Sequence, residues 1–329
     1  MMKSGMMCTA MAALFFAGGA GAEMKTKELS WVLPAPATHV YAVEVVSLES
    51  KGGVEKQVRS VTRGRIETRK TDTGYLQEWR DSMISHEYTG YDDEQKKMLG
   101  DMFKAAENLP VKVALTKDGA YESVLNVAEW TALFKAAMDK VFSDVQAAAL
   151  AKIPADRRAE AKAQMEKQTS GLMAVMASPA YMQKQLEKIP FAYSFFNGGG
   201  LDPEQAYELE DSTANPFGGE PFPIKLHIEI SLDEQDPGFV YALYKTRLDQ
   251  DKGRPALAAA IKQIVGKDAA GVDAEIEKLL KEFEISTEVN LRISLKTGVV
   301  HWMEYAGTKQ FPGSVEVTTT EMTLEDAAK

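Results

Sequence analysis

Residues 224–232 read IKLHIEISL, with an apolar side chain at every second position. Residues 289–295 read VNLRISL and alternate in the same way. Successive side chains of a β-strand point to opposite faces, so each run predicts a strand with one buried face and one solvated face. Strands of this kind are typical of antiparallel sheets. The two runs therefore predict an antiparallel sheet in the last third of the chain.

Further strands extend this sheet. Thr297-Gly298 and Pro312-Gly313 are turn signals that return the chain into strands at 299–305 and 315–322. Additional strands are expected at 40–48, 54–68, 75–88, 111–115 and 121–125. Glycine-containing turns separate several of these segments, so the N-terminal part is also expected to form an antiparallel meander.

Helices are expected to interrupt the strands in three places. Asp92–Ala106 opens with acidic residues, which favour the positive end of a helix dipole. The longest excursion, residues 126–189, keeps apolar residues at helical spacing, and Pro154 and Pro179 divide it into about three helices. A helical pair is expected at 254–283. These helices have apolar faces that must cover another surface.

A stretch rich in glycine and proline, residues 196–223, is predicted to be a linker. It separates an N-terminal β-meander with its helical block, residues 23–195, from a C-terminal β-meander, residues 224–329. The expected fold class is α+β: a large curved antiparallel sheet, in one or two lobes, with the helical excursions packed on its concave face. The two meanders share an order of elements that fits either a duplication or independent origins.

The first residues have the composition of an export signal. An apolar run follows one basic residue, and Ala20 and Ala22 supply the small side chains that signal peptidase requires. Residues 1–22 are therefore predicted to be removed, giving a mature start at Glu23 and a periplasmic or secreted protein. The apolar segment before Cys8 is too short for lipid attachment there. The alternative interpretation of these residues is a buried N-terminal helix.

Composition excludes several classes of function. Cys8 is the only cysteine, so the mature chain is expected to contain no disulfide, thiol nucleophile or thiolate-bound metal. The sequence holds 38 Lys+Arg and 48 Asp+Glu, a formal net charge of −10, which disfavours nucleic acid and anionic lipid as partners. Beyond the signal no apolar stretch reaches transmembrane length, so the mature chain is expected to be soluble.

No sequence motif for catalysis, metal binding or phosphate binding is complete. The histidines stand isolated in the sequence, at His39, His86, His227 and His301. Asp249–Gly253 resembles the opening of a calcium loop but lacks the later ligands, and Gly198–Gly200 lacks the lysine of a phosphate loop. Ser170 and Ser314 lack the second glycine of a nucleophile elbow. No catalytic residue, metal or cofactor is predicted, and a hydrolase is only a minor alternative.

The helical block is unusual in its content of methionine and aromatic residues. Thioether side chains are unbranched and polarizable, so they adapt to irregular apolar shapes such as lipid tails or a varying partner helix. The candidate ligand-binding residues are Trp130, Phe134, Met138, Met173, Met176 and Tyr181. The alternative interpretation is that these side chains pack in an ordinary hydrophobic core.

The order of elements resembles the periplasmic half-barrels of the lipoprotein-carrier type. The likeness covers residues 38–125 and 222–323 and lies in the order of strands, helices and terminal hairpin, without a specific motif. In that family a curved sheet wraps around helices and can hold acyl chains. The resemblance implies a non-enzymatic envelope protein that binds an apolar small molecule, a lipid or a lipid-bearing partner. The alternative is a structural or protein-interaction protein of the cell envelope with a fully packed core.

Overall fold

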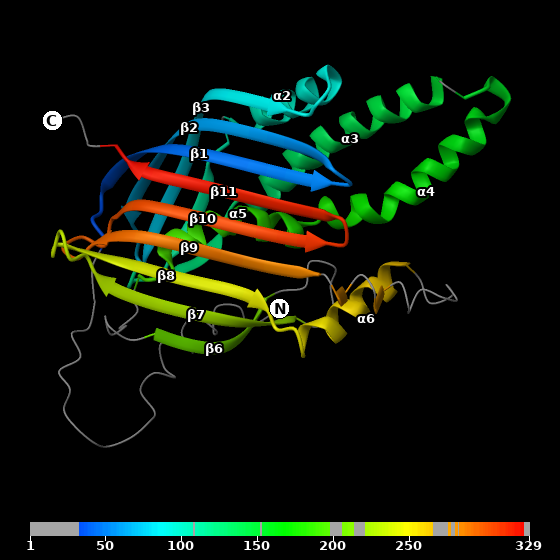
Figure 1. Ribbon diagram of the computed structural model, residues 1–329. Helices are drawn as coiled ribbons and strands as arrows, with labels where there is room; N and C mark the ends of the chain where they lie inside the picture. The colour runs from blue at the N-terminus through cyan, green and yellow to red at the C-terminus, as the bar shows by residue number, and fades with distance from the viewer. Residues whose placement is uncertain are drawn as a thin grey trace.

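One large antiparallel sheet dominates the computed structural model (Figure 1). The structure describes residues 33–107, 109–151, 153–197, 206–213, 221–265, 276–277, 280–281 and 283–325. The sheet has 11 strands in the order β5-β4-β3-β2-β1-β11-β10-β9-β8-β7-β6 and does not close. This confirms the predicted α+β class with a large antiparallel sheet. The predicted export signal lies outside the described residues.

The strands of the first meander lie where the sequence predicts them. They are β1 (Ala37–Lys51), β2 (Val54–Lys70), β3 (Tyr75–Thr89), β4 (Val111–Leu115) and β5 (Tyr121–Val124). The second meander consists of β6 (Ala206–Thr213), β7 (Phe222–Leu232), β8 (Phe239–Leu248), β9 (Glu284–Ser294), β10 (Val300–Phe311) and β11 (Ser314–Leu324). Strands β6 and β8 were not expected from the sequence, and β6 lies within the stretch 196–223 that was predicted as a linker.

The two meanders are joined edge to edge by the first and last strands. β1 and β11 pair antiparallel from Tyr41–Leu324 to Lys51–Ser314. This pairing places the first and last strands of the chain side by side in the middle of the sheet. It leaves β5 and β6 as the two outer edge strands. Both meanders thus form a single sheet.

The described helices are α2 (Asp93–Ala106), α3 (Val127–Ala151), α4 (Arg158–Met176), α5 (Pro179–Ser194) and α6 (Gly253–Val265), with a short 3-10 helix η1 (Ala155–Arg157). Helices α3, α4 and α5 confirm the three helices expected in the block 126–189. Asp92 caps α2, accepting a hydrogen bond from the Gln95 N–H at 2.8 Å. Ser178 caps α5 in the same way, with Pro179 at its first position.

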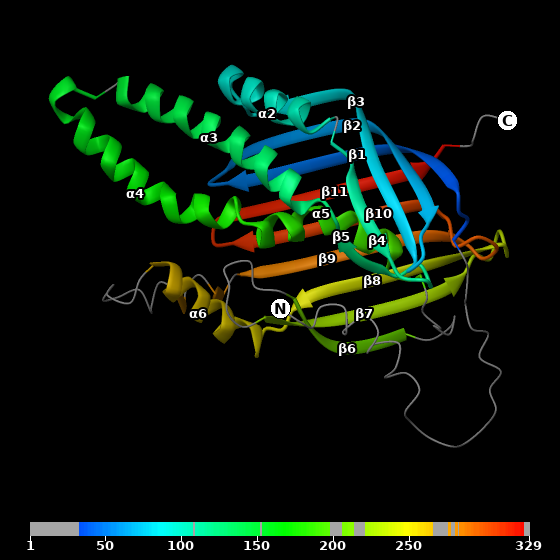
Figure 2. The ribbon, with the colours of Figure 1, turned by 180° about the vertical axis from the view of Figure 1, so that it is seen from behind.

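Helix α5 defines the concave face of the sheet. Its side chains Ala192 and Tyr193 share a core cluster with β7–β10, while Leu186 and Phe191 pack against the buried residues of β3–β5. One helix can contact both ends of the strand order only if the sheet curves around it. Figure 2 shows α3, α4 and α5 on this side, with α3 and α4 extending past the strands. A smaller cluster joins α6 to Phe222 of β7.

Candidate functional site

A buried tyrosine pair fixes α5 to the sheet. The hydroxyl groups of Tyr193 and Tyr41 lie 2.8 Å apart. Tyr41 donates to the Val300 carbonyl at 2.9 Å, so Tyr193 donates to Tyr41. Burial raises the pKa of Tyr193 to about 12 and that of Tyr41 well above its ordinary value, so both phenols remain neutral. The Trp79 and Tyr193 rings meet edge to face, with centroids 5.1 Å apart.

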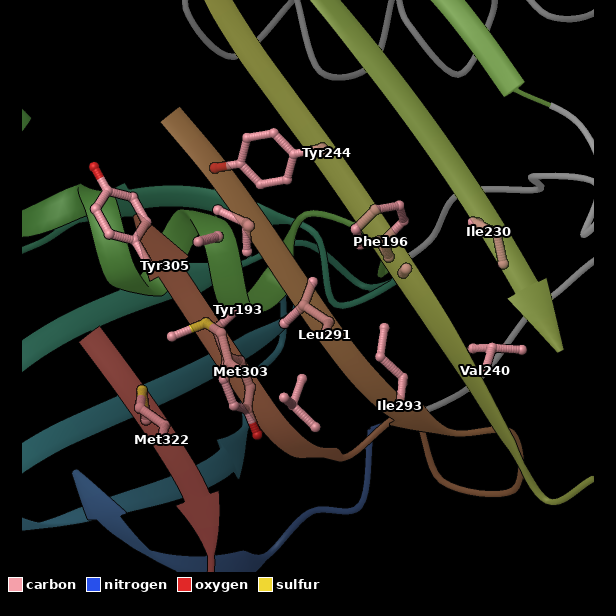
Figure 3. Packing of buried hydrophobic residues seen from close by; sticks show 14 of the residues in the cluster. Tyr193, Phe196, Ile230, Val240, Tyr244, Leu291, Ile293, Met303, Tyr305 and Met322 are labelled. Carbon is pink, nitrogen blue, oxygen red and sulfur yellow. The ribbon is translucent and has the colours of Figure 1, made fainter. Parts of the chain in front are cut away.

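Side chains fill the space around the C-terminal half of α5. Phe195 stacks on Tyr244 with ring centroids 4.5 Å apart. Figure 3 shows Tyr193 and Phe196 among the side chains of β8, β9 and β10. Leu291 and Met303, which lie in this cluster, have no exposed surface. This end of the concave face is a packed core, as the interaction-protein alternative expects.

Helix α3 is packed very differently. Among its described side chains none is buried. Its half-buried apolar side chains include Trp130, Leu133, Phe134, Met138, Val141 and Phe142. A surface helix normally presents its apolar stripe to the core. Here the stripe of a helix of 25 residues is covered only in part, so it remains available to another apolar group.

The structure brings three of the predicted site residues together. Trp130, Phe134 and Met138 follow one another at four-residue intervals and therefore lie along one face of α3. The Trp130 indole N–H donates to the Pro110 carbonyl at 3.2 Å, which fixes this end of the face beside β4. Part of the Trp130 side chain remains in contact with solvent.

The other predicted site residues lie on neighbouring helices. Tyr181 is half-buried in the first turn of α5, where its backbone N–H donates to Ser178 Oγ at 3.2 Å. Met173 and Met176 belong to the last part of α4, and their side chains lie outside the described residues. Their place in a lining stays a prediction.

Asp81 also lies on the concave face, although no sequence pattern singled it out. It pairs with Gly64 across β2 and β3. A Cβ built on Gly64 would lie 3.1 Å from Asp81 Oδ1 and 3.0 Å from Val43 Cγ2, and Val43 belongs to the core that packs on α5. The Asp81 side chain therefore points to the concave side. Trp79 and Met83 stand on the same face, two residues before and two residues after Asp81. The sequence does not reveal this alternation, because charged residues stand on both faces of β3.

Beyond Asp81 the edge of β3 is free of strand pairing. β4 pairs with β3 only from Tyr75 to Trp79, so within the described residues Arg80–Thr89 has a strand neighbour only on the β2 side. Helix α2 covers the far end of this segment, where the Phe103 ring stacks on His86 with centroids 4.4 Å apart.

The described part of the chain gives little support for a metal site or for a membrane-spanning helix. No group of three or more His, Cys, Asp or Glu side chains there is placed to hold a metal ion. None of the helices described is long and apolar enough to cross a membrane. A hollow of about 290 Å³ lies at the β1–β2 hairpin, where Glu49, Lys51, Val54 and Lys56 line it.

Comparison with known proteins leaves the function open. No protein-family model matches the sequence, and no curated protein matches it. Among solved structures, one of lipovitellin that concerns lipid–protein interactions in that protein is similar with a TM-score of 0.42 and 8% identity. The match covers 88% of this chain and 25% of the lipovitellin chain. At this level the likeness carries no information on function.

Proposed function

We propose that the protein is exported and that it binds an apolar small molecule, a lipid or a lipid-bearing partner along α3 on the concave side of the sheet. One observation carries this proposal: the apolar face marked by Trp130, Phe134 and Met138 is covered only in part, although α3 lies on the side where the core is built. Extended apolar surface of this kind marks binding sites more often than ordinary surface does.

The contrast with α5 supplies the energetic argument. Full burial of a Leu, Phe or Met side chain stabilises a protein by about 1.5–3 kcal/mol. Helix α5 gains this through Met182 and Tyr193, whose exposed fractions are 4% and 3%, whereas α3 leaves its apolar side chains partly exposed. An apolar ligand on this face would bury the remaining surface. Methionine and aromatic side chains suit such a ligand because they adapt to its shape.

The test is lipid extraction and mass analysis of protein purified from its native host. We expect copurifying lipid, and we expect Met138→Glu to abolish it while the protein stays folded by circular dichroism. Ala136→Glu is the matched control, because Ala136 is exposed on the same helix and the change introduces the same charge. Ala136→Glu should retain the lipid.

Two results would contradict the proposal. If Met138→Glu unfolds the whole protein, that side chain belongs to the core, because an unpaired charge in a packed interior is strongly destabilising. If the wild-type protein carries no lipid and binds none, the structural or interaction role is favoured, in agreement with the packing around Phe195 and Tyr244. Export is tested separately by the mass of the envelope form, which should begin at Glu23 without a lipid.

A further inference from the structure

The strand register places four side chains in one row at the tips of two neighbouring hairpins. Taken across β10, β11, β1 and β2, the residues that pair in this row are Phe311, Ser314, Lys51 and Val54. Directly opposite residues of an antiparallel pair point to the same face of a sheet. Lys51 shares the alternation of Val43, which lies in the core on the concave face. The row, here called the hairpin rim, therefore forms the outer limit of the concave face.

Two apolar side chains of the hairpin rim are open to solvent. Val54 is 60% exposed and Phe311 is 38% exposed. The two hairpins are joined at their turns, where the Gly52 N–H donates to the Gly313 carbonyl at 3.1 Å. They lie at the end of the sheet past which α3 and α4 extend (Figures 1 and 2). Because the chain is already ordered at these tips, they can enter an apolar phase without the entropic cost of ordering a loop.

A row of charged side chains lies directly behind the hairpin rim. Two residues back along each strand, on the same face, the paired residues are Lys309, Glu316, Glu49 and Lys56. Lys309 and Glu316 form an ion pair at 3.0 Å, and the Lys56 ammonium lies over the Tyr91 ring, 5.1 Å from its centroid. Two residues of a strand span about 7 Å. The charged row carries both signs in equal number and is neutral, although the whole chain has a formal net charge of −10.

This layering matches that of a phospholipid surface. Amphipathic segments that lie on a bilayer bury their apolar side chains about 5–10 Å into the boundary between head groups and acyl chains, and the charged row stands about 7 Å behind the rim. Zwitterionic head groups carry both signs of charge, as the charged row does. A stable protein partner would need a face of about 800 Å², whereas two turn tips offer a narrow projection. The observations therefore favour a lipid surface over a protein.

We propose that the hairpin rim docks the protein on a surface of zwitterionic phospholipid, with Val54 and Phe311 in the interface and the charged row at the level of the head groups. The Lys51 side chain suits this position, because a lysine stem can lie along apolar surface while its ammonium group stays in water. The acidic chain as a whole disfavours an anionic lipid surface. Docking at the rim is independent of ligand binding along α3, so either proposal can fail alone.

Sedimentation of the full chain with phosphatidylcholine vesicles tests this docking. We expect the wild-type protein to bind, and Val54→Ser combined with Phe311→Ser to lower the partition coefficient by about tenfold or more, because two apolar side chains no longer enter the interface. Tyr241→Ser is the matched control. Tyr241 is 43% exposed, but it lies on the convex face, since its neighbours Val240 and Ala242 belong to the core. This control should bind as the wild-type protein does.

Val54→Ser alone separates docking from folding. Phe311 also contacts the Phe283 ring, with centroids 5.1 Å apart, whereas Val54 is largely exposed, so its replacement should leave thermal unfolding unchanged and still lower the partition coefficient by about threefold or more. If the wild-type protein does not sediment with the vesicles, or if the rim variants and Tyr241→Ser bind equally, docking at the rim is wrong. If only vesicles that contain phosphatidylglycerol bind the protein, the zwitterionic match is overturned. Lipid that copurifies from the host should remain in the rim variants, because that measurement tests α3.

Discussion

At the scale of single residues, two hydroxyl groups fix the position of α5. Tyr193 donates to Tyr41, and Tyr41 donates to the Val300 carbonyl, all within the buried core. The two tyrosines occupy unequal places in this chain of hydrogen bonds. Loss of the Tyr193 hydroxyl leaves the hydrogen bond from Tyr41 to Val300 intact. Loss of the Tyr41 hydroxyl breaks both hydrogen bonds.

Tyr193→Phe and Tyr41→Phe should therefore differ in stability. We expect Tyr193→Phe to lower the free energy of unfolding by about 1 kcal/mol, the usual net contribution of one hydrogen bond. Tyr41→Phe should lower it by about 2–3 kcal/mol, because the Tyr193 hydroxyl and the Val300 carbonyl both lose a partner in the core. Urea titration measures both values. Equal losses of stability in the two variants would contradict donation from Tyr193 to Tyr41.

Asp81 makes stability depend on pH. Its pKa is raised in the folded protein because the surrounding protein desolvates the charged form. The folded state then holds a proton more firmly than the unfolded chain, so the stabilisation from protonation is fully present below the unfolded pKa of about 3.9. It is lost as pH rises through the raised folded pKa.

Asp81→Asn should remove this dependence. We expect the variant to be more stable than the wild-type protein at neutral pH, and the advantage to shrink as the pH falls toward 4. Chemical denaturation of both proteins across this range measures the difference. A constant difference at every pH would rule out the titration of Asp81 as its cause.

At the scale of strands and helices, alternation predicted the buried face through most of the two clean runs, but it was wrong at Leu232, the last residue of the first run, which is 41% exposed. Ile228 and Ile293, on the apolar side of their runs, have exposed fractions of 3% and 1%. Glu229, on the polar side of the first run, is exposed. Substitutions at neighbouring positions of one strand should therefore change the free energy of unfolding by very different amounts.

Truncation of these side chains should reveal that asymmetry. Ile228→Ala and Ile293→Ala should each lower the free energy of unfolding by about 2–5 kcal/mol, because each leaves a cavity in the core. Glu229→Ala should have an effect within about 0.5 kcal/mol, as surface changes usually do. Guanidinium denaturation of the three variants measures this, and equal losses on both faces would contradict the strand register.

The missed strands have physical explanations. β6 reads AYELEDST, and its acidic residues together with the glycines and prolines around it gave the appearance of a linker. It is a strand because it pairs along β7, from Ala206–Glu229 to Thr213–Phe222. β8 was missed because Tyr241 and Leu243 place bulky apolar residues on its outer face and blur the alternation. Tertiary pairing decided both cases, and no local pattern records it.

The candidate site was predictable to a smaller extent than the fold. The spacing of Trp130, Phe134 and Met138 on one helix face follows directly from the sequence. The degree to which that face is covered does not follow from the sequence, because it depends on how α5 and α3 pack together on the concave side of the sheet. Asp81 was beyond prediction for a similar reason: its face is set by pairing with Gly64, and no charge pattern distinguishes it from the solvated acids nearby.

At the scale of the whole molecule, the concave side divides into a packed part and a loosely covered part. The C-terminal half of α5 belongs to the first, with Tyr193 and Ser194 buried. Helix α3 belongs to the second, and α4 extends with it past the strands (Figure 2). Segments with few buried apolar contacts open at low free energy, whereas core segments open only with global unfolding.

Hydrogen exchange should resolve these two parts and report the ligand. We expect the amides of α3 to exchange faster than those of residues 189–194 in α5, since α3 has no buried side chain among those described. Addition of decanol, an uncharged apolar probe, should slow exchange in α3, because a ligand on its apolar face stabilises only the closed helix, and should leave residues 189–194 nearly unchanged. Equal, slow exchange in both helices before any addition would show that α3 belongs to the core. In that case the partly covered face of α3 would not be a binding surface, and the interaction role would replace the proposed function.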